Sequence, residues 1–406
     1  MATRSTLAAI MCGLLVTLAS RGSSTNALVN AVAQLDESRI LQLASEAINR
    51  APPAITDSRA TNSAGGLHDY FSQADYYWPN PHTKSGFPYL NRDGYSNPTN
   101  FSEHRLALRT MKDSVAALAA AYSLTGNDAY AVKAQEFLRV FFLDPATRMN
   151  PSLNYAQAIL GTDKGTQLGI IDTLHLAELA VAIPFLEKSP SFDPAVDAGM
   201  KQWFTNYIRW MTTSSNGKQE MRAPNNHSIA YDLQIACFAR LVGDQKNFDL
   251  ARQRFERTQL PGQMATTGSF PRELKRTKPF GYSNFQADNV AILCFLFSTP
   301  QTNVWQFRLP KKVTAERTTQ FIYPYLANKQ QWLEEGRRMD VEHWDGWPVR
   351  QASLLFAYVE TSNATYFDLW KTLNPDPSDL EVRRNLAITQ PLLWLAQPAE
   401  IPLLVP

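Results

Sequence analysis

Pairs of helical segments separated by short breaks recur along this chain and constrain its fold most strongly. In one pair, Gly126-Asn-Asp separates an apolar, alanine-rich segment from a second helical segment. The predicted pairs are Leu106–Leu124 with Ala129–Phe142, Thr166–Leu186 with Pro194–Thr213, Ile229–Leu241 with Phe248–Phe255, and Gln351–Val359 with Thr365–Leu373. Further helices are predicted at Leu35–Asn49, Asn289–Phe297 and Leu380–Leu395, whereas alternating strand patterns are scarce. Repeated antiparallel helix pairs predict an all-α protein, either a solenoid or a closed α/α toroid.

The composition is that of a folded globular protein. Of the 406 residues, 44% are hydrophobic and 19% are charged, and the net charge is +2. Such a small net charge gives no overall field that would attract nucleic acid. No shift in composition marks a second domain, so we expect a single domain over residues 28–406.

The N-terminal stretch Met1–Ala27 has the pattern of a secretory signal peptide. Arg4 supplies a positive charge, and Leu7–Ala19 is an apolar run that is too short to span a bilayer. We therefore expect a soluble, exported protein, which is periplasmic if the host is Gram-negative. In a eukaryotic host, Asn100 and Asn363 would each begin a glycosylation sequon.

A long irregular stretch, Ala51–Ser102, lies between the first predicted helix and the first helix pair. It is rich in proline, glycine, asparagine and aromatic residues. Such a stretch inside a compact domain is usually either functional or disordered, and its aromatic content argues against disorder. We expect a structured loop that lines a site, where Tyr76, Tyr77 and Trp78 can stack on sugar rings.

The cysteines give no sign of a disulfide framework or a metal site. Cys12 lies in the predicted signal peptide, whereas Cys237 and Cys294 lie in apolar helical runs. We expect the last two to be buried free thiols. His175 also lies in an apolar helix and is expected in the core.

A first polar cluster lies at Met221–Asp232, where two amides and an imidazole precede an apolar helix. After Pro224, the residues Asn225, Asn226 and His227 lie at or near the N-terminus of that helix. Backbone N–H groups and the helix dipole favour an anion there. The alternative is an asparagine N-cap followed by a histidine with ordinary hydrogen bonds.

A second polar cluster begins 45 residues after His227. It combines basic side chains with a tyrosine and an amide, namely Arg272, Lys275, Arg276, Lys278, Tyr282 and Asn284. Basic groups beside Tyr282 would lower its pKa by favouring the phenolate, as a tyrosine base requires. The alternative is a solvated basic loop. We expect the two clusters to meet in one cleft, where Asn226, His227 and Arg276 hold a sugar carboxylate and the tyrosine moves a proton.

The loop Gly161–Gly169, with Asn154 and Gln157 shortly before it, is a third candidate. It matches neither the Walker motif nor the dinucleotide-binding glycine motif, so nucleotide binding is not expected. The two amides could hydrogen-bond sugar hydroxyls, and a plain connecting loop is the alternative. His82 and His343 are further candidates because they lie beside aromatic residues in polar stretches.

Five motifs together resemble the alginate lyase superfamily. In the family's order they are D-Y-Y-W-P-N-P (75–81), N-Y-A-Q (154–157), N-N-H (225–227), R-T-K-P-F-G-Y-S-N-F (276–285) and Q-P-L-L-W-L (390–395). The closest resemblance is to polysaccharide lyase family 38, and families 5 and 17 are more distant. The resemblance covers about Gly66–Leu395, and the lack of room for a C-terminal β-sheet domain disfavours family 17.

The resemblance implies an incomplete (α/α) toroid, catalysis without a metal or another cofactor, and β-elimination on uronate polymers. Residue by residue, it assigns Asn226 and His227 as the pair that neutralises the substrate carboxylate. It also assigns Arg276 as the assisting arginine and Tyr282 as the catalytic tyrosine.

The residues expected to bind the substrate come from the aromatic loop and from all three candidate stretches. They are Tyr76, Tyr77, Trp78, Asn154, Gln157, Lys164, Asn225, Arg272 and Asn284. One departure from the commonest family pattern is the loop after Gln157, which lacks the arginine expected in many relatives. Lys164 could supply the missing charge.

The expected reaction starts with the weakly acidic proton on C5 of a uronate. Removing this proton places a second negative charge on the adjacent carboxylate, so hydrogen-bond donors must meet that charge. Either Tyr282 acts as both base and acid, or Tyr282 is the acid and His227 is the base. We therefore expect β-elimination on a β-1,4-linked polyuronate, either the mannuronate blocks of alginate or glucuronan.

Two other functions fit parts of the same sequence. A toroidal glycoside hydrolase would need two carboxylates, for which the candidates are Asp75, Asp93, Asp163, Glu273 and Asp345. A non-catalytic polyuronate-binding protein would keep the aromatic loop and would not need Tyr282. For the favoured lyase we expect an acidic polysaccharide partner, no nucleic acid, membrane or cofactor, and a monomeric chain.

Overall fold

A computed structural model describes residues 27–396 apart from residues 300, 308 and 310–312. The first 26 residues, which hold nearly all of the predicted signal peptide, lie outside this part of the chain. The described chain is helical from residue 27 to residue 48, which confirms the first predicted helix. Helices continue to dominate after the irregular stretch that follows.

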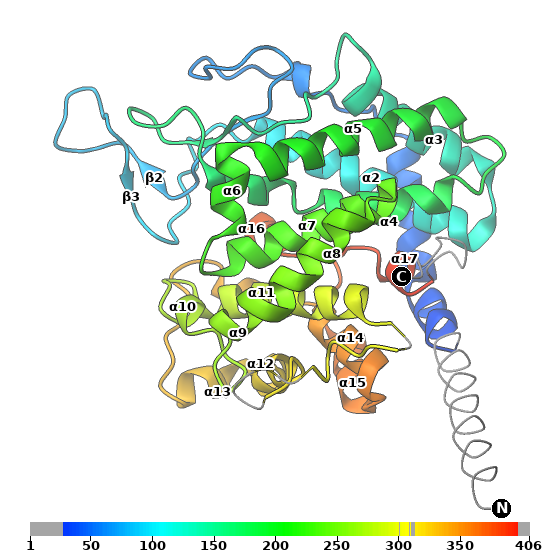
Figure 1. Ribbon diagram of the computed structural model, residues 1–406, viewed down its shortest axis with the longest axis vertical. Helices are drawn as coiled ribbons and strands as arrows, with labels where there is room; N and C mark the ends of the chain where they lie inside the picture. The colour runs from blue at the N-terminus through cyan, green and yellow to red at the C-terminus, as the bar shows by residue number, and fades with distance from the viewer. Residues whose placement is uncertain (1–26, 300, 308, 310–312, 397–406) are drawn as a thin grey trace, which may run out of the picture.

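Five helices that follow one another around a ring form the inner layer of the fold (Figure 1). They are α2 (Glu103–Thr125), α4 (Leu176–Leu186), α7 (Asn226–Val242), α11 (Pro279–Phe297) and α14 (Ala352–Thr361). Each of them contacts the next in this order. Nearly every side chain of α7 and α11 is buried, because these two helices are covered on all sides.

Five further helices form the outer layer. They are α3 (Asp128–Leu138), α5 (Pro194–Thr213), α8 (Gln245–Arg254), α12 (Arg317–Ala327) and α15 (Ala364–Thr372). Of these, α3 packs on α2, α5 and α8 pack on α7, α12 packs on α11, and α15 packs on α14. The two layers make an incomplete (α/α) toroid of antiparallel helix hairpins.

Segments from both ends of the described chain fill the space between α14 and α2. The helix over residues 27–48 reaches both sides of this gap: Arg350, just before α14, donates to Asp36 at 2.6 Å, and Arg39 pairs with Asp376 at 2.5 Å. Arg50, just after this helix, donates to Ser114 of α2 at 3.1 Å. The short helix α17 (Pro391–Leu395) packs against α2 and α4.

The strands are short and lie beside the ring. Strand β1 (Phe71–Gln73) pairs in parallel with β4 (Tyr155–Ala158), and β2 (Tyr77–Trp78) pairs in antiparallel with β3 (Leu90–Asn91). The β2–β3 segment forms an arm that projects from the ring (Figure 1). The irregular stretch is therefore structured, as its aromatic content predicted.

Three of the four predicted helix pairs are confirmed as packed pairs. In the fourth, both helices form, but α5 packs on α7 rather than on α4. Three predicted boundaries are wrong. Thr166–Leu186 divides into a 3₁₀ helix, Gln167–Thr173, and α4. The helix predicted from Asn289 begins earlier, at Pro279. The prediction missed its first turns because they bury polar side chains and therefore show no apolar pattern. The predicted helix Leu380–Leu395 is two helices, α16 (Leu380–Arg384) and α17, because Pro391 cannot continue a helix and starts a new one.

The remaining elements are short. They are the 3₁₀ helices Ile55–Asp57 and Trp344–Gly346, the π-helical turns Arg139–Leu143 and Phe255–Gln259, and the helices α6 (Ser215–Met221), α9 (Leu260–Gln263), α10 (Pro271–Leu274) and α13 (Lys329–Glu334). Two of them, α6 and α10, position residues of the site described below.

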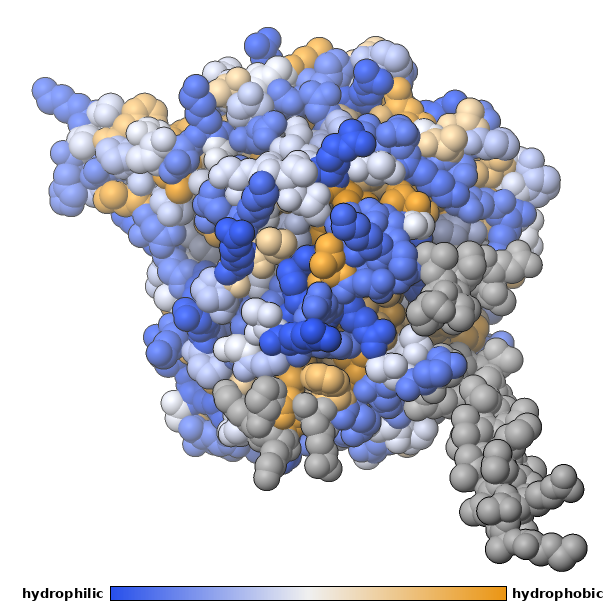
Figure 2. All heavy atoms as spheres, in the orientation of Figure 1, coloured by the Kyte–Doolittle hydropathy of each residue, from blue (hydrophilic) through white to orange (hydrophobic). Residues whose placement is uncertain are grey.

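A single large hydrophobic core fills the space between the two helix layers. Cys237 and Cys294 are buried free thiols in this core, as predicted. The segment Gln167–Leu186 is long and apolar enough to cross a membrane, but most of it is buried inside the fold, as in a core helix. The face shown in Figure 2 is mostly hydrophilic, and its apolar side chains lie in separate patches.

Candidate active site

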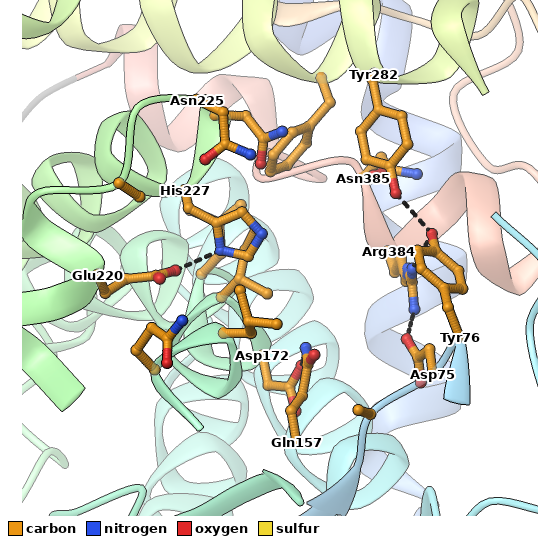
Figure 3. A pocket seen from close by; sticks show the side chains of 18 of the residues that line it. Asp75, Tyr76, Gln157, Asp172, Glu220, Asn225, His227, Tyr282, Arg384 and Asn385 are labelled. Atoms are coloured by element: carbon orange, nitrogen blue, oxygen red, sulfur yellow. Dashed lines mark hydrogen bonds and ion pairs between the residues drawn. The ribbon is translucent and has the colours of Figure 1, made fainter. Parts of the chain in front are cut away.

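A cleft of about 620 Å³ brings the two predicted polar clusters together. Its walls come from residues 74–77, from the 3₁₀ helix Gln167–Thr173, from the turn between α6 and α7, and from the ends of α11 and α16 that face the cleft. Figure 3 shows His227 and Tyr282 on different sides of this cleft. The predicted meeting of the two clusters is therefore correct.

Asn226 and His227 form one wall, in the first turn of α7. Two donors of Asn226, its backbone N–H and its Nδ2, bond to the carboxylate of Glu273 at 2.9 and 2.7 Å. The Nδ1 atom of His227 lies 2.5 Å from Oε1 of Glu220, which α6 supplies (Figure 3). These two carboxylates fix both side chains at the helix terminus, where an anion is favoured.

The charge of His227 is set by its carboxylate partner. Burial alone lowers the pKa of His227, but Glu220 more than offsets this effect, so the pKa is raised above its ordinary value. Because Nδ1 faces the carboxylate, Nε2 is the nitrogen that remains for a ligand. His227 is thus suited to donate a hydrogen bond as an imidazolium.

Tyr282 forms the opposite wall, in the first turn of α11. Its hydroxyl accepts a hydrogen bond from Nη2 of Arg276 at 2.9 Å and lies 2.9 Å from the hydroxyl of Tyr76. The Arg276 guanidinium also lies 4.0 Å from the centre of the Tyr282 ring. Asp340 holds this turn in place, because it accepts from the backbone N–H groups of Phe280 and Gly281 at 2.7 and 2.8 Å.

The predicted lowering of the Tyr282 pKa is wrong for the free protein. Burial raises the pKa of Tyr282, and the nearby Arg276 and Tyr76 only partly offset this rise. The sequence could not show that Asp93 neutralises the arginine: Arg276 donates to Asp93 from Nε at 3.0 Å and from Nη2 at 2.5 Å. Only Nη1 of the guanidinium remains for a substrate.

Tyr76 connects Tyr282 to a charged network at the C-terminal end of the chain. Its hydroxyl donates to Glu381 at 3.3 Å and accepts from Nη2 of Arg384 at 3.0 Å. Lys278 pairs with the same Glu381 at 2.5 Å. Arg384 also pairs with Asp75 (Figure 3), so α16 holds the start of the aromatic stretch against the ring.

Gln157 lies on the floor of the cleft in a strained backbone conformation. Its φ is +45°, which is uncommon for a residue other than glycine. Its Nε2 donates to Asp172 at 3.0 Å, and the same carboxylate accepts from Ser72 at 2.6 Å and pairs with Arg105 at 3.4 Å. Asp172 therefore fixes the side-chain amide of Gln157 through its nitrogen.

Both the sequence and the fold match known proteins. The alginate lyase family matches residues 54–332, which is more than half of the chain. The crystal structure of an alginate lyase from Bacteroides ovatus is 31% identical, with a TM-score of 0.79 over 92% of this chain and 97% of that chain. The chain belongs to the alginate lyase family.

Membership of the alginate lyase family makes this protein a polysaccharide lyase and agrees with the incomplete (α/α) toroid. Alginate lyase A1-III from Sphingomonas species A1 is 15% identical, with a TM-score of 0.53 over 83% of this chain and 88% of that chain, and supports the fold. No match was found among curated protein sequences.

In this alginate lyase family member, eight of the predicted site residues line the cleft. They are Tyr76, Tyr77, Gln157, Asn225, Asn226, His227, Arg276 and Tyr282. The others lie elsewhere: Trp78 donates to the Tyr95 carbonyl oxygen at 2.9 Å, and Asn154 accepts from Trp210 at 2.9 Å. Lys164 and Arg272 are exposed outside the cleft lining, and Asn284 is buried in α11.

Several residues of the site were missed because no local motif marks them. They are the carboxylate and arginine partners Glu220, Glu381 and Arg384, and the cleft residues Arg109 and Asp172. His175, which was expected in the core, is buried but also lines the cleft. Glu220 had the best available signal, since it lies seven residues before His227. The others reach the cleft only through the tertiary fold.

The five carboxylates considered for a hydrolase are placed differently from a glycosidase pair. Asp75, Asp93 and Glu273 are engaged by Arg384, Arg276 and Asn226, while Asp163 and Asp345 are exposed. Burial would raise the pKa of Asp93, but Arg276 and Thr277 lower it below its ordinary value. A general acid needs the opposite shift. Among the described residues, no three His, Cys, Asp or Glu side chains cluster as metal ligands would.

Proposed function

We propose that this protein cleaves a β-1,4-linked polyuronate by β-elimination, either the mannuronate blocks of alginate or glucuronan. One observation supports this most directly: the Tyr282 hydroxyl is fixed between Arg276 and Tyr76, on the other side of the cleft from the His227–Glu220 pair. In this arrangement, Tyr282 could transfer a proton and His227 could bind the carboxylate of the same uronate. Family membership at the level of a polysaccharide lyase agrees with it.

The cleft can meet the charge that develops on the substrate carboxylate. Loss of the C5 proton turns the carboxylate into an enolate with a second negative charge, so pre-positioned donors lower the barrier. The His227 imidazolium and the free Nη1 of Arg276 are such donors, and the helix N-terminus at Asn226 adds a favourable dipole. The C5–H bond breaks, its electrons form the C4–C5 double bond, and the O4–C4 bond breaks as O4 takes a proton.

Tyr282 is better suited than His227 to be the base. Glu220 raises the pKa of His227, which favours the charged imidazolium, and an imidazolium cannot accept a proton. In β-linked mannuronate and glucuronate, H5 and O4 lie on the same face of the sugar ring. One tyrosine can therefore remove H5 as a phenolate and then return the proton to O4. In guluronate the two lie on opposite faces, so a second group would be needed.

Export, glycosylation and assembly are further parts of the proposal. Met1–Ala27 has the pattern of a signal peptide, which supports a secreted or periplasmic enzyme. Asn363 is exposed at the start of α15, whereas Nδ2 of Asn100 donates to the Ala74 carbonyl oxygen at 2.9 Å. Asn363 is thus the better glycosylation site in a eukaryotic host. We further propose a monomer and a place in polysaccharide lyase family 38.

Growth of ultraviolet absorbance on separate polymers tests the reaction. Polymannuronate, polyguluronate, glucuronan and pectate should be compared, because β-elimination leaves an absorbing double bond and hydrolysis does not. Absorbance should grow on polymannuronate or glucuronan. New reducing ends without absorbance would mean a hydrolase, and binding without either product would mean a binding protein.

Replacing Tyr282 by phenylalanine tests the assignment of the tyrosine. Tyr282→Phe should lower kcat by about 10²- to 10⁴-fold, the usual worth of general acid–base catalysis, while substrate binding is retained. Tyr130→Phe, in α3 of the outer layer, is the matched control and should keep full activity. A Tyr282→Phe enzyme with most of its kcat would overturn the assignment.

A further inference from the structure

The charges that line the cleft are almost all paired with one another. Asp93 pairs with Arg276, Glu220 pairs with His227, and Asp75 pairs with Arg384. Asp172, also in the lining, pairs with Arg105 behind the cleft at 3.4 Å. Each carboxylate of the lining therefore has a cation within the protein, and none needs a cation from a ligand.

Arg109 is the exception among the cations that are shielded from solvent. It lies on α2 and lines the cleft. Its Nε atom is buried, and within the described part of the chain the guanidinium has neither a hydrogen-bond acceptor nor a carboxylate within 4.0 Å. Burial, together with the like charge of Arg105, lowers the pKa of Arg109 to about 10. The free protein thus holds a guanidinium at the cleft without a direct partner, although Asp172 and Glu381 attract it from beyond 4.0 Å.

Such a cation costs free energy in the unliganded protein, because desolvation is not offset by a partner. A carboxylate from a ligand would remove this cost, and a guanidinium binds carboxylates through two parallel N–H donors. His175 lines the cleft beside Arg109, and burial, followed by the charge of Arg109, lowers its pKa well below the ordinary value. His175 is therefore a neutral imidazole that can donate one further hydrogen bond without adding charge.

We propose that Arg109 forms a second carboxylate subsite, which binds the carboxylate of a uronate next to the sugar that is cleaved. This inference rests on the proposed function, since the ligand is the same polyuronate chain. The reacting carboxylate meets His227 and Arg276, and the neighbouring one meets Arg109. The enzyme would then select runs of consecutive acidic sugars and discriminate against a chain whose neighbouring sugar is neutral.

Removing the charge of Arg109 should weaken activity on a polyuronate without lowering the stability of the free protein. Arg109→Gln should raise KM or lower kcat/KM on a polyuronate by about 10- to 100-fold, the loss of one or two charge-assisted hydrogen bonds. Without substrate, its Tm should be equal to or higher than that of the wild type, because the unpaired charge is gone. Arg109→Lys should recover part of the lost binding. Arg257→Gln, an exposed arginine outside the cleft lining, is the matched control and should change neither quantity.

The substrate itself gives a second readout. A polyuronate whose carboxylates have been partly reduced to alcohols should be a poorer substrate than the intact polymer for the wild type. Arg109→Gln should lose most of this discrimination. A lower Tm with unchanged KM and unchanged discrimination would show that Arg109 only supports the fold and would overturn the subsite. If the wild type itself forms no unsaturated product on any polyuronate, the proposed function fails, and the subsite fails with it.

Discussion

At the scale of single residues, the chemistry of the cleft depends on partners that lie far away in the sequence. The motifs N-N-H and R-T-K-P-F-G-Y predicted which residues would meet. They could not predict the charge states, because Asp93, which neutralises Arg276, is 183 residues away, and the burial of Tyr282 follows only from the tertiary fold. The predicted lowering of the tyrosine pKa was wrong for this reason.

Replacing Glu220 by glutamine should change how activity depends on pH. Activity in the wild type needs both the Tyr282 phenolate and the His227 imidazolium. Below the pKa of His227, kcat/KM should rise with pH as the phenolate fraction grows. Above that pKa, kcat/KM should level off, because the imidazolium fraction falls as fast as the phenolate fraction grows. Glu220→Gln removes the carboxylate that raises this pKa, so the levelling-off should move to lower pH. The plateau should fall about tenfold for each unit by which the His227 pKa drops. Steady-state kinetics between about pH 5 and pH 10 measures both effects.

The same variant also reports on stability. The pKa of His227 is raised in the folded protein, so the pair contributes stability that is fully present below about pH 6.5 and is lost as pH rises through the folded pKa. Glu220→Gln should therefore cost most near about pH 6, on the order of 1–3 kcal/mol, and least near about pH 9. Urea unfolding at both pH values measures this difference, and an equal cost at both would contradict a charged His227.

At the scale of elements, the long helices could be predicted from the sequence, whereas the short segments that line the cleft could not. The sequences of the outer and inner helices show apolar residues at helical spacing over many residues, and this pattern predicts a helix. The start of α11 could not be predicted, because its first turns bury polar residues that form no apolar stripe. Helix α6 is too short to give a periodic signal, yet it supplies Glu220.

Replacing Gly217 by alanine should displace α6 and disturb the site. A Cβ at Gly217 would lie 1.7 Å from the carbonyl oxygen of Met211 in α5, so the helix would have to move and take Glu220 with it. Gly217→Ala should cost roughly 3 kcal/mol of stability and lower kcat. Gly262→Ala is the control, because nothing lies within 4 Å of its new Cβ. Urea unfolding and kinetics on both variants decide the matter, and a Gly217→Ala enzyme that matches the control would argue against this role of α6.

At the scale of the whole molecule, the repeated helix pairs predicted a ring, but not how the ring is closed. Closure depends on contacts between the two ends of the described chain, such as Arg39 with Asp376, which are 337 residues apart. No local pattern marks such pairs. Glu178 of α4 anchors the C-terminal segment, because its carboxylate accepts from the backbone N–H groups of Thr389 and Gln390 at 2.7 Å each. Lys112 of α2 pairs with the same carboxylate at 3.1 Å.

Replacing Glu178 by alanine should loosen this closure. The variant leaves the buried Lys112 without this partner and two backbone N–H groups without an acceptor, so it should cost about 3–5 kcal/mol. Activity should fall as well, because the loosened segment follows Arg384 and Asn385, which line the cleft. Glu136→Ala, which removes an exposed pair with Lys133, should cost less than about 1 kcal/mol. Thermal unfolding compares the two, and equal values of Tm would refute the anchoring role of Glu178.

The wall formed by Tyr76 and Arg384 has a consequence for the order of events on the ribosome. These two residues are 308 positions apart, and their side chains meet at 3.0 Å in the finished cleft. A chain is made from its N-terminus, so the tyrosine leaves the ribosomal tunnel long before the arginine does. Throughout that interval Tyr76 lacks the cation that holds its hydroxyl in the finished cleft. This wall of the cleft can therefore form only after residue 384 has left the tunnel.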